Sequence, residues 1–132
     1  ITAGAAGTAS TLAGIPFYQG DTGSIYTHDV SGTDNTAQYN TSYGLTSLDA
    51  ITTGDSNTTV GYGAGGALTT GTGNVIIGRD AGDALTDDSQ STLVGGYAGS
   101  AATVGQLTGV GYGALYAVTT GVRNTAIGYD AT

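Results

Sequence analysis

The chain of 132 residues contains no Cys, no Met and no Trp, and its single Pro and single Phe are the neighbours Pro16 and Phe17. Without cysteine there is no disulfide framework and no thiol nucleophile. Glu and Lys are also absent, so ten Asp and two Arg carry the charge, and the formal net charge is −8. So few cations argue against binding to nucleic-acid phosphates or anionic lipid. We therefore expect no nucleic-acid partner, and the lack of a long apolar run argues against membrane insertion.

Catalytic chemistry has few candidates in this composition. His28 is the only His, and with Asp29 and either Ser24 or Ser31 it could form only a fragment of a hydrolase site. Adjacent residues on a strand point to opposite faces, and no nucleophile-elbow motif is present. The glycine-rich stretch 61–66 is not followed by the Lys-Ser/Thr of a phosphate-binding loop. We predict that the protein is not an enzyme and uses no cofactor.

The residue types that the chain does use in quantity, Gly and Thr above all, fall into a repeat. Phrases of the type Asn-Thr-Ala-Ile-Gly-Tyr-Asp-Ala, here at 124–131, recur five times from residue 57 at steps of 17, 17, 16 and 17 residues. Such a unit is too short for a helix-turn-helix repeat but suits one coil of a β-solenoid, with short strands and tight turns. The sequence predicts an all-β fold, a β-solenoid or β-roll with coils of about 17 residues, over residues 40–132.

The aligned repeats predict which side chains stack upon one another. The residue before the repeated glycine is β-branched and should form the core, together with the mostly Thr residue two positions earlier on the same face. The glycine itself should sit at positive φ or at a close backbone approach. A second apolar pair, such as Ala67-Leu68, predicts a second short strand before the turn. The expected core residues are Val60, Ile77, Val94, Val110 and Ile127, and the expected turn glycines are Gly44, Gly61, Gly78, Gly95, Gly111 and Gly128.

Residues 1–39 do not follow the period clearly. We interpret them either as an irregular N-terminal cap or as an assembly segment that docks on another subunit. In the second case Leu12, Ile15, Phe17 and Tyr18 are the expected apolar anchors. Because a thin column of small residues buries little apolar surface, we expect copies of the chain to associate, as a lateral trimer or as a head-to-tail polymer. The missing Met and the half-finished coil before Thr132 suggest a fragment or a processed product.

The densest acidic group consists of Asp80, Asp83, Asp87 and Asp88. It is interpreted as solvated turns or as a weak candidate for a Ca²⁺ site, although its spacing matches no EF-hand. The tripeptides that begin at Asn40 and Asn57 fit the acceptor pattern for N-glycosylation and leave that modification open.

Tyrosines form a column in the repeat, with one member displaced by a position. Such a column is interpreted either as packing, for example against a neighbouring chain, or as a binding surface for a cell-surface glycan. The residues are Tyr62, Tyr112, Tyr129 and the displaced Tyr97.

The phrase at 124–131, with closings such as Leu-Thr-Thr-Gly at 68–71, resembles the repeats of bacteriophage tail-fibre proteins. It is also similar to the head repeats of trimeric autotransporter adhesins, whose coil is shorter. The resemblance covers roughly residues 40–132 and implies strand-rich fibres, commonly homotrimers, that stand off a surface. We therefore expect a structural subunit of an extracellular or virion fibre that assembles through its solenoid edges and N-terminal segment. The alternative is a surface-binding module: a glycan-contacting adhesin or tail-fibre tip, or an ice-binding solenoid suggested by the Thr pairs at 52–53, 69–70 and 119–120.

Overall fold

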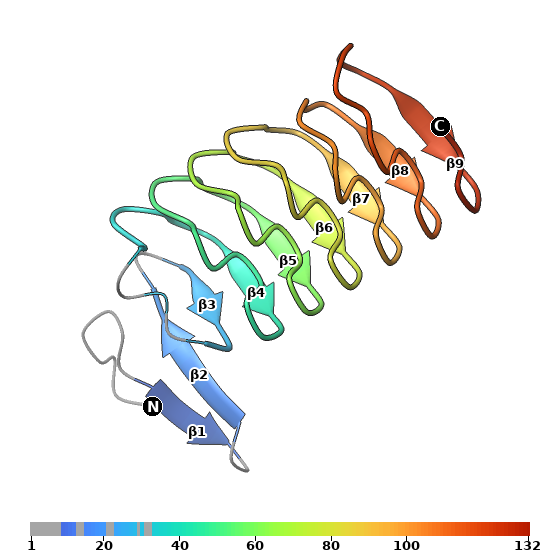
Figure 1. Cartoon of the computed structure of the whole chain (residues 1–132). Coiled ribbons are helices and arrows are strands. Elements are labelled where there is room, and N and C mark those ends of the chain that lie inside the picture. The colour runs from blue at the N-terminus through green and yellow to red at the C-terminus, as the bar shows by residue number, and fades with distance from the viewer. Residues whose placement is uncertain (1–8, 13–14, 21–22, 29, 31–32) are drawn as a thin grey trace.

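A computed structural model of the chain describes residues 9–12, 15–20, 23–28, 30 and 33–132. Its described elements form one sheet of nine strands in chain order, from β1 to β9. Successive strands from β3 onward lie on successive coils of a solenoid (Figure 1). The predicted all-β solenoid is therefore confirmed. The coil strands are β3 (Ile25–Tyr26), β4 (Thr41–Tyr43), β5 (Thr58–Val60), β6 (Val75–Ile77), β7 (Thr92–Val94), β8 (Thr108–Val110) and β9 (Thr125–Ile127).

Parallel pairing joins each coil to the next at equivalent positions of the repeat. Thr58 pairs with Val75 and Val60 with Ile77, and the same register continues to β9. Outside the strands the backbones also bond from coil to coil, as in Thr52 N donating to Thr69 O at 2.9 Å. The second strand predicted around Leu68 does not form, because this stretch runs through turns. Leu68 is nevertheless fully buried, as its apolar column requires.

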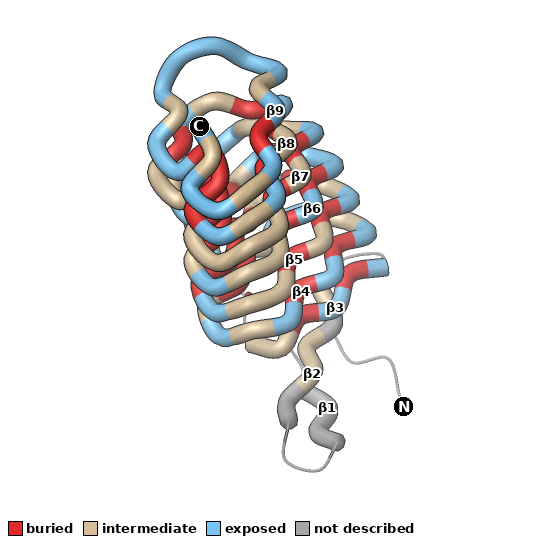
Figure 2. Tube along the Cα trace, turned by 90° about the vertical axis from the view of Figure 1, so that its right-hand side faces the viewer, coloured by how far each residue is buried: buried red, intermediate tan, exposed pale blue. Residues whose placement is uncertain are grey.

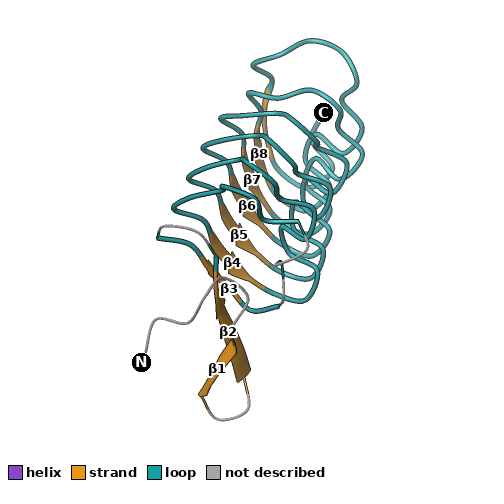
Figure 3. Ribbon diagram, turned by 90° about the vertical axis from the view of Figure 1, so that its left-hand side faces the viewer, coloured by secondary structure: helices purple, strands orange, loops and turns teal. Residues whose placement is uncertain are grey.

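The solenoid begins earlier than the sequence period suggests. Ile25 pairs in parallel with Thr41, so a coil already runs through residues assigned to the irregular segment 1–39. Before it, β1 (Ala9–Leu12) and β2 (Ile15–Gln19) form an antiparallel hairpin, and β2 pairs antiparallel with β3. Figure 3 shows this hairpin continuing the sheet beyond the first coil. Within the chain, the hairpin covers the N-terminal edge of β3.

The predicted orientation of the coil strands is wrong. The middle residue of each three-residue strand is buried, and the first and third are exposed or intermediate (Figure 2). Ile76 and Leu93 are completely buried, whereas Val110 is 37% exposed and Ile127 is 73% exposed. Since side chains alternate along a strand, placing Val60, Ile77, Val94, Val110 and Ile127 inside would put the buried residues outside. The expected core column is therefore part of the outer face.

Buried asparagines connect the coils in a ladder that the sequence analysis did not identify. Asn40 Oδ1 accepts a hydrogen bond from Asn57 N at 2.8 Å, and Asn57 Oδ1 accepts one from Asn74 N at 3.0 Å. The amide group of Asn57 donates to Gly71 O at 2.9 Å. Asn40 and Asn57 are fully buried in this ladder, so in the folded chain their amide groups are not open to glycosylation.

None of the described residues belongs to a helix that could span a bilayer.

Candidate interaction surface

The first and third residues of the coil strands make a regular outer face on the sheet. Parallel pairing in register stacks identical repeat positions one strand spacing apart, so the face consists of two straight columns. Along the chain the first column is Thr41, Thr58, Val75, Thr92, Thr108 and Thr125, and the second is Tyr43, Val60, Ile77, Val94, Val110 and Ile127. Eleven of these twelve residues are Thr, Val or Ile, all of them β-branched, and Tyr43 is the one aromatic member.

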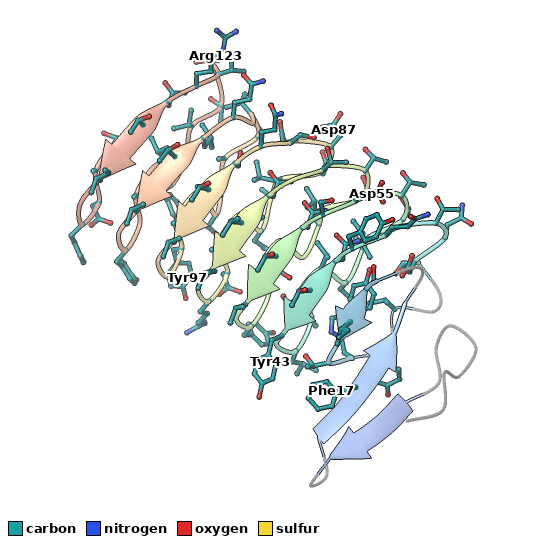
Figure 4. The ribbon with its side chains drawn as sticks, turned by 180° about the vertical axis from the view of Figure 1, so that it is seen from behind. Phe17, Tyr43, Asp55, Asp87, Tyr97 and Arg123 are labelled. Carbon is teal, nitrogen blue, oxygen red and sulfur yellow. The ribbon has the colours of Figure 1, made fainter. Side chains whose placement is uncertain are left out.

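No charged residue belongs to these columns, although the chain carries ten Asp and two Arg. Figure 4 shows Asp55, Asp87 and Arg123 on the turn side far from the strand ends that carry Tyr43 and Tyr97. Asp55 and Asp87 therefore lie away from these strand ends, whereas Asp80 and Asp130 belong to the turns that follow β6 and β9. An uncharged, partly exposed face of β-branched side chains has the composition of a surface that becomes buried on association.

The glycine after each strand sets the sharp corner that ends the outer face. All six predicted glycines have positive φ, from 129° at Gly61 to 144° at Gly44. A Cβ atom added at Gly61 would lie 2.6 Å from Gly78 O on the next coil, and one at Gly78 would overlap the carbonyl group of Gly95. Both reasons given for the glycine column are confirmed. Close stacking at this corner requires the absence of a side chain in each successive coil.

A row of rings follows the corner at the C-terminal half of the array. Tyr112 and Tyr129 are stacked, with ring centroids 5.3 Å apart and planes inclined by 10°. Tyr97 meets Tyr112 edge-on at 5.6 Å, and the Arg79 guanidinium lies 5.4 Å from the centre of the Tyr97 ring. Tyr97, Tyr112 and Tyr129 thus pack along the solenoid axis, whereas Tyr62 is 54% exposed and has no ring contact among the described residues. The shared ring faces of Tyr112 and Tyr129 are not open to a sugar ring.

The four aspartates proposed as a weak Ca²⁺ site do not come together. Asp80 pairs with Arg79 at 3.1 Å. Burial first, and the charge of Asp80 next, raise the pKa of Asp83. Burial and the neighbouring Asp87 raise the pKa of Asp88, in a different turn of the coil. Within the described ranges, no three His, Cys, Asp or Glu residues are placed to hold a metal ion. The chain passes through two turns between Asp80 and Asp88, which separates the group into two pairs.

A shallow groove lies at the turn where one repeat is a residue shorter. Its volume is about 440 Å³, and Asp87, Asp88, Gln106 and Arg123 contribute to its lining. Arg123 Nε donates to Gln106 Oε1 at 3.2 Å across this groove.

His28 lies elsewhere, on the first coil, with Nε2 3.3 Å from Asp49 Oδ1. Asp29 and Ser31, named with it in the sequence, lie outside the described residues.

The proposed N-terminal anchors lie on the hairpin. Leu12 and Ile15 face each other in the register of β1 and β2, and their side chains are outside the described part of the structure. Phe17 and Tyr18 are half-buried, and Tyr18 packs against the core of its own chain. Two hydroxyl groups of the Thr pairs are bonded within the chain: Thr52 Oγ1 donates to Thr69 O at 3.0 Å, and Thr69 Oγ1 donates to Thr86 O at 2.9 Å. Comparisons with protein families, with curated proteins and with solved structures found no match to this chain.

Proposed function

We propose that the chain is a non-enzymatic structural subunit that associates with further copies of itself through the outer face, as part of an extracellular or virion fibre. The observation that carries the proposal is the outer face itself: two in-register columns, free of charge, on a chain of net charge −8. Two such copies repel one another over most of their surface. Because the two columns of the outer face carry no charge, two acidic copies can approach there with less repulsion between like charges.

The geometry of the face favours a second copy as the occupant. Equivalent side chains repeat at the strand spacing of about 4.8 Å, so a second copy offers the same spacing and its columns interdigitate with the first. The exposed members include the apolar residues Val75 at 36%, Val110 at 37% and Ile127 at 73%, beside the polar Thr41 and Thr125. Burial of the apolar residues supplies the driving force for association.

The N-terminal hairpin supports lateral association over the head-to-tail alternative. Docking of β2 on another copy would require it to leave β3, with which Tyr18 and Gln19 already pair. A variant that lacks residues 1–20 separates the two geometries. Lateral assemblies persist in this variant, whereas head-to-tail polymers held by the hairpin disappear.

Sedimentation velocity over a range of concentrations tests the proposal. The wild-type chain should form oligomers, and the fraction of chain in oligomers should rise with salt concentration because salt screens the acidic surface. Val110→Asp places a like charge on the outer face and should shift the chain to monomer. Val122→Asp is the matched control, because Val122 is 53% exposed but lies on a turn outside the two columns. Circular dichroism and thermal unfolding confirm that both variants fold.

A wild-type chain that remains monomeric at all concentrations and salt conditions overturns the proposal. That result favours the alternative of a surface-binding module. Glycan-array binding and an ice-recrystallisation assay then distinguish a glycan-contacting module from an ice-binding one. Equal loss of oligomers in Val110→Asp and Val122→Asp assigns the effect to net charge and also contradicts the outer face as the interface.

A further inference from the structure

The residue types that are oxidised most readily in proteins are missing from this chain. Cys, Met and Trp are all absent, while Tyr occurs nine times. Thiols and thioethers normally take up oxidants before other side chains do. In their absence a one-electron oxidant acts on the phenol rings of tyrosine. The position of each tyrosine then decides where the resulting radicals react.

Two tyrosines are placed so that their rings meet on adjacent coils. Val110 pairs with Ile127, and two residues further on Tyr112 and Tyr129 occupy the same repeat position. Their ring centroids are 5.3 Å apart with planes inclined by 10°. The side chains are 48% and 76% exposed, so an oxidant reaches both rings and both have room to rotate.

We propose that Tyr112 and Tyr129 form a site of oxidative cross-linking, which a peroxidase with hydrogen peroxide converts to dityrosine. Each phenol gives up one electron and one proton to form a phenoxyl radical. The two radicals join through a carbon–carbon bond between ring positions next to the oxygen atoms, and the proton on each bonded ring carbon then moves through solvent to the oxygen of its own ring, which restores both phenols. Overall, two tyrosines lose one hydrogen atom each and hydrogen peroxide is reduced to two molecules of water.

Proximity selects this pair from the exposed tyrosines. Radicals already in contact couple without a diffusional encounter, which raises their effective concentration greatly. Tyr116 provides a comparison, because it is 48% exposed like Tyr112 but has no ring contact among the described residues. The bond would join the coils of β8 and β9 covalently, beside the hydrogen bond from Asp130 N to Tyr112 O at 2.8 Å.

The two arginines make the cross-link easy to locate. Trypsin divides the unfolded chain after Arg79 and Arg123, so Tyr129 is the only tyrosine in fragment 124–132 and Tyr112 lies in fragment 80–123. The chain at low concentration is treated with a haem peroxidase and hydrogen peroxide, unfolded in urea and digested. We expect dityrosine fluorescence and a joined species of these two fragments, lighter by two hydrogen atoms than their sum.

Phenylalanine variants and isotope labelling decide whether the stacked pair is responsible. Tyr112→Phe should abolish the joined species, and Tyr116→Phe should leave its yield unchanged. An equal mixture of ¹⁴N and ¹⁵N chains should give joined species of one label only. Persistence of the joined species in Tyr112→Phe, its absence from the oxidised wild-type chain, or mixed-label species as the main product would each overturn the proposal.

Discussion

The side chain of Leu93 occupies the space that a side chain at Gly99 would need: a Cβ atom added at Gly99 would lie 2.8 Å from Leu93 Cδ1. In the next coil the arrangement is reversed, because Gly109 takes the strand position and the fully buried Leu115 follows six residues later. The coil with Ser42 on the strand and Leu48 six residues later has the same arrangement as Gly109 and Leu115. The coil with Ile76 on the strand and Gly82 six residues later has the same arrangement as Leu93 and Gly99. Each of these coils therefore fills its interior from one of two positions.

This exchange predicts a compensating double substitution. Gly99→Leu alone should overpack the coil and destabilise it by about 1–3 kcal/mol. Leu93→Gly alone should leave a cavity and cost about 2–5 kcal/mol. The pair together copies the coil of Gly109 and Leu115, where Leu115 already tolerates a φ of 55°. Urea unfolding should show a double variant much more stable than the sum of the single effects, whereas simple additivity would show that the two positions do not share one space.

The asparagine ladder predicts a large loss from a small change. Asn57→Ala removes the acceptor of Asn74 N and the donor to Gly71 O, both within the buried ladder. Each buried group left without a partner costs about 1–3 kcal/mol, so the free energy of unfolding should fall by roughly 2–5 kcal/mol. Asn124→Ala is the control, because Asn124 is only half-buried and its amide donates to the exposed Gly121 O. Chemical denaturation of the two variants should separate them clearly, and similar losses would count against the ladder.

The corner glycines predict two separable costs. Gly78→Ala suffers both a φ of 139° and overlap with the carbonyl group of Gly95. Gly128→Ala has a similar φ of 137°, but its nearest atom is Ala131 Cβ at 3.8 Å. The backbone cost of about 1–3 kcal/mol should appear in both variants. Thermal unfolding should show a larger loss for Gly78→Ala, and equal losses would mean that close stacking contributes little.

Tyr26 predicts a loss of stability at alkaline pH. Burial first, and the charge of Asp34 next, raise the pKa of Tyr26 from 10.0 to about 12. The pKa of Tyr26 is higher in the folded chain than in the unfolded chain. The contribution of the protonated Tyr26 to the free energy of unfolding is therefore complete below pH 10 and is lost as the pH rises towards 12. The part due to Tyr26 is on the order of 2 kcal/mol. Tyr26→Phe should flatten the decline in unfolding free energy over this range, and an unchanged decline would assign it to other groups.

The sequence could predict the columns of the repeat but not the face on which they lie. Val60 and Ile77 recur at the repeat spacing, and such a regular β-branched column is typical of a core. The inner column, by contrast, varies from Thr59 to Leu93 to Gly109. It varies because a second position six residues later compensates for its volume, and that contact is not visible along the chain. A strand of three residues is also too short for alternation to distinguish its two faces.

The sequence could predict only part of the candidate surface, because contacts between coils are not visible along the chain. The tyrosines at 62, 97, 112 and 129 were identified as a column, but their ring contacts depend on the coil spacing. The acidic group at 80–88 is dense in sequence, and the turns divide it. The coil that contains Tyr26 lacked the repeated phrase, so its place in the solenoid emerged only from its pairing with β4.

By itself the sequence determined the all-β solenoid, the coil length and the glycine corner, because a period and an obligatory glycine express backbone requirements that every coil shares. Tertiary structure alone decided which face of each strand is buried, how Leu93 and Gly99 share volume, and which rings touch. These depend on contacts between coils, where one side chain fills the space that another residue leaves empty. Such compensation conserves the packed volume and leaves the individual residues free to differ.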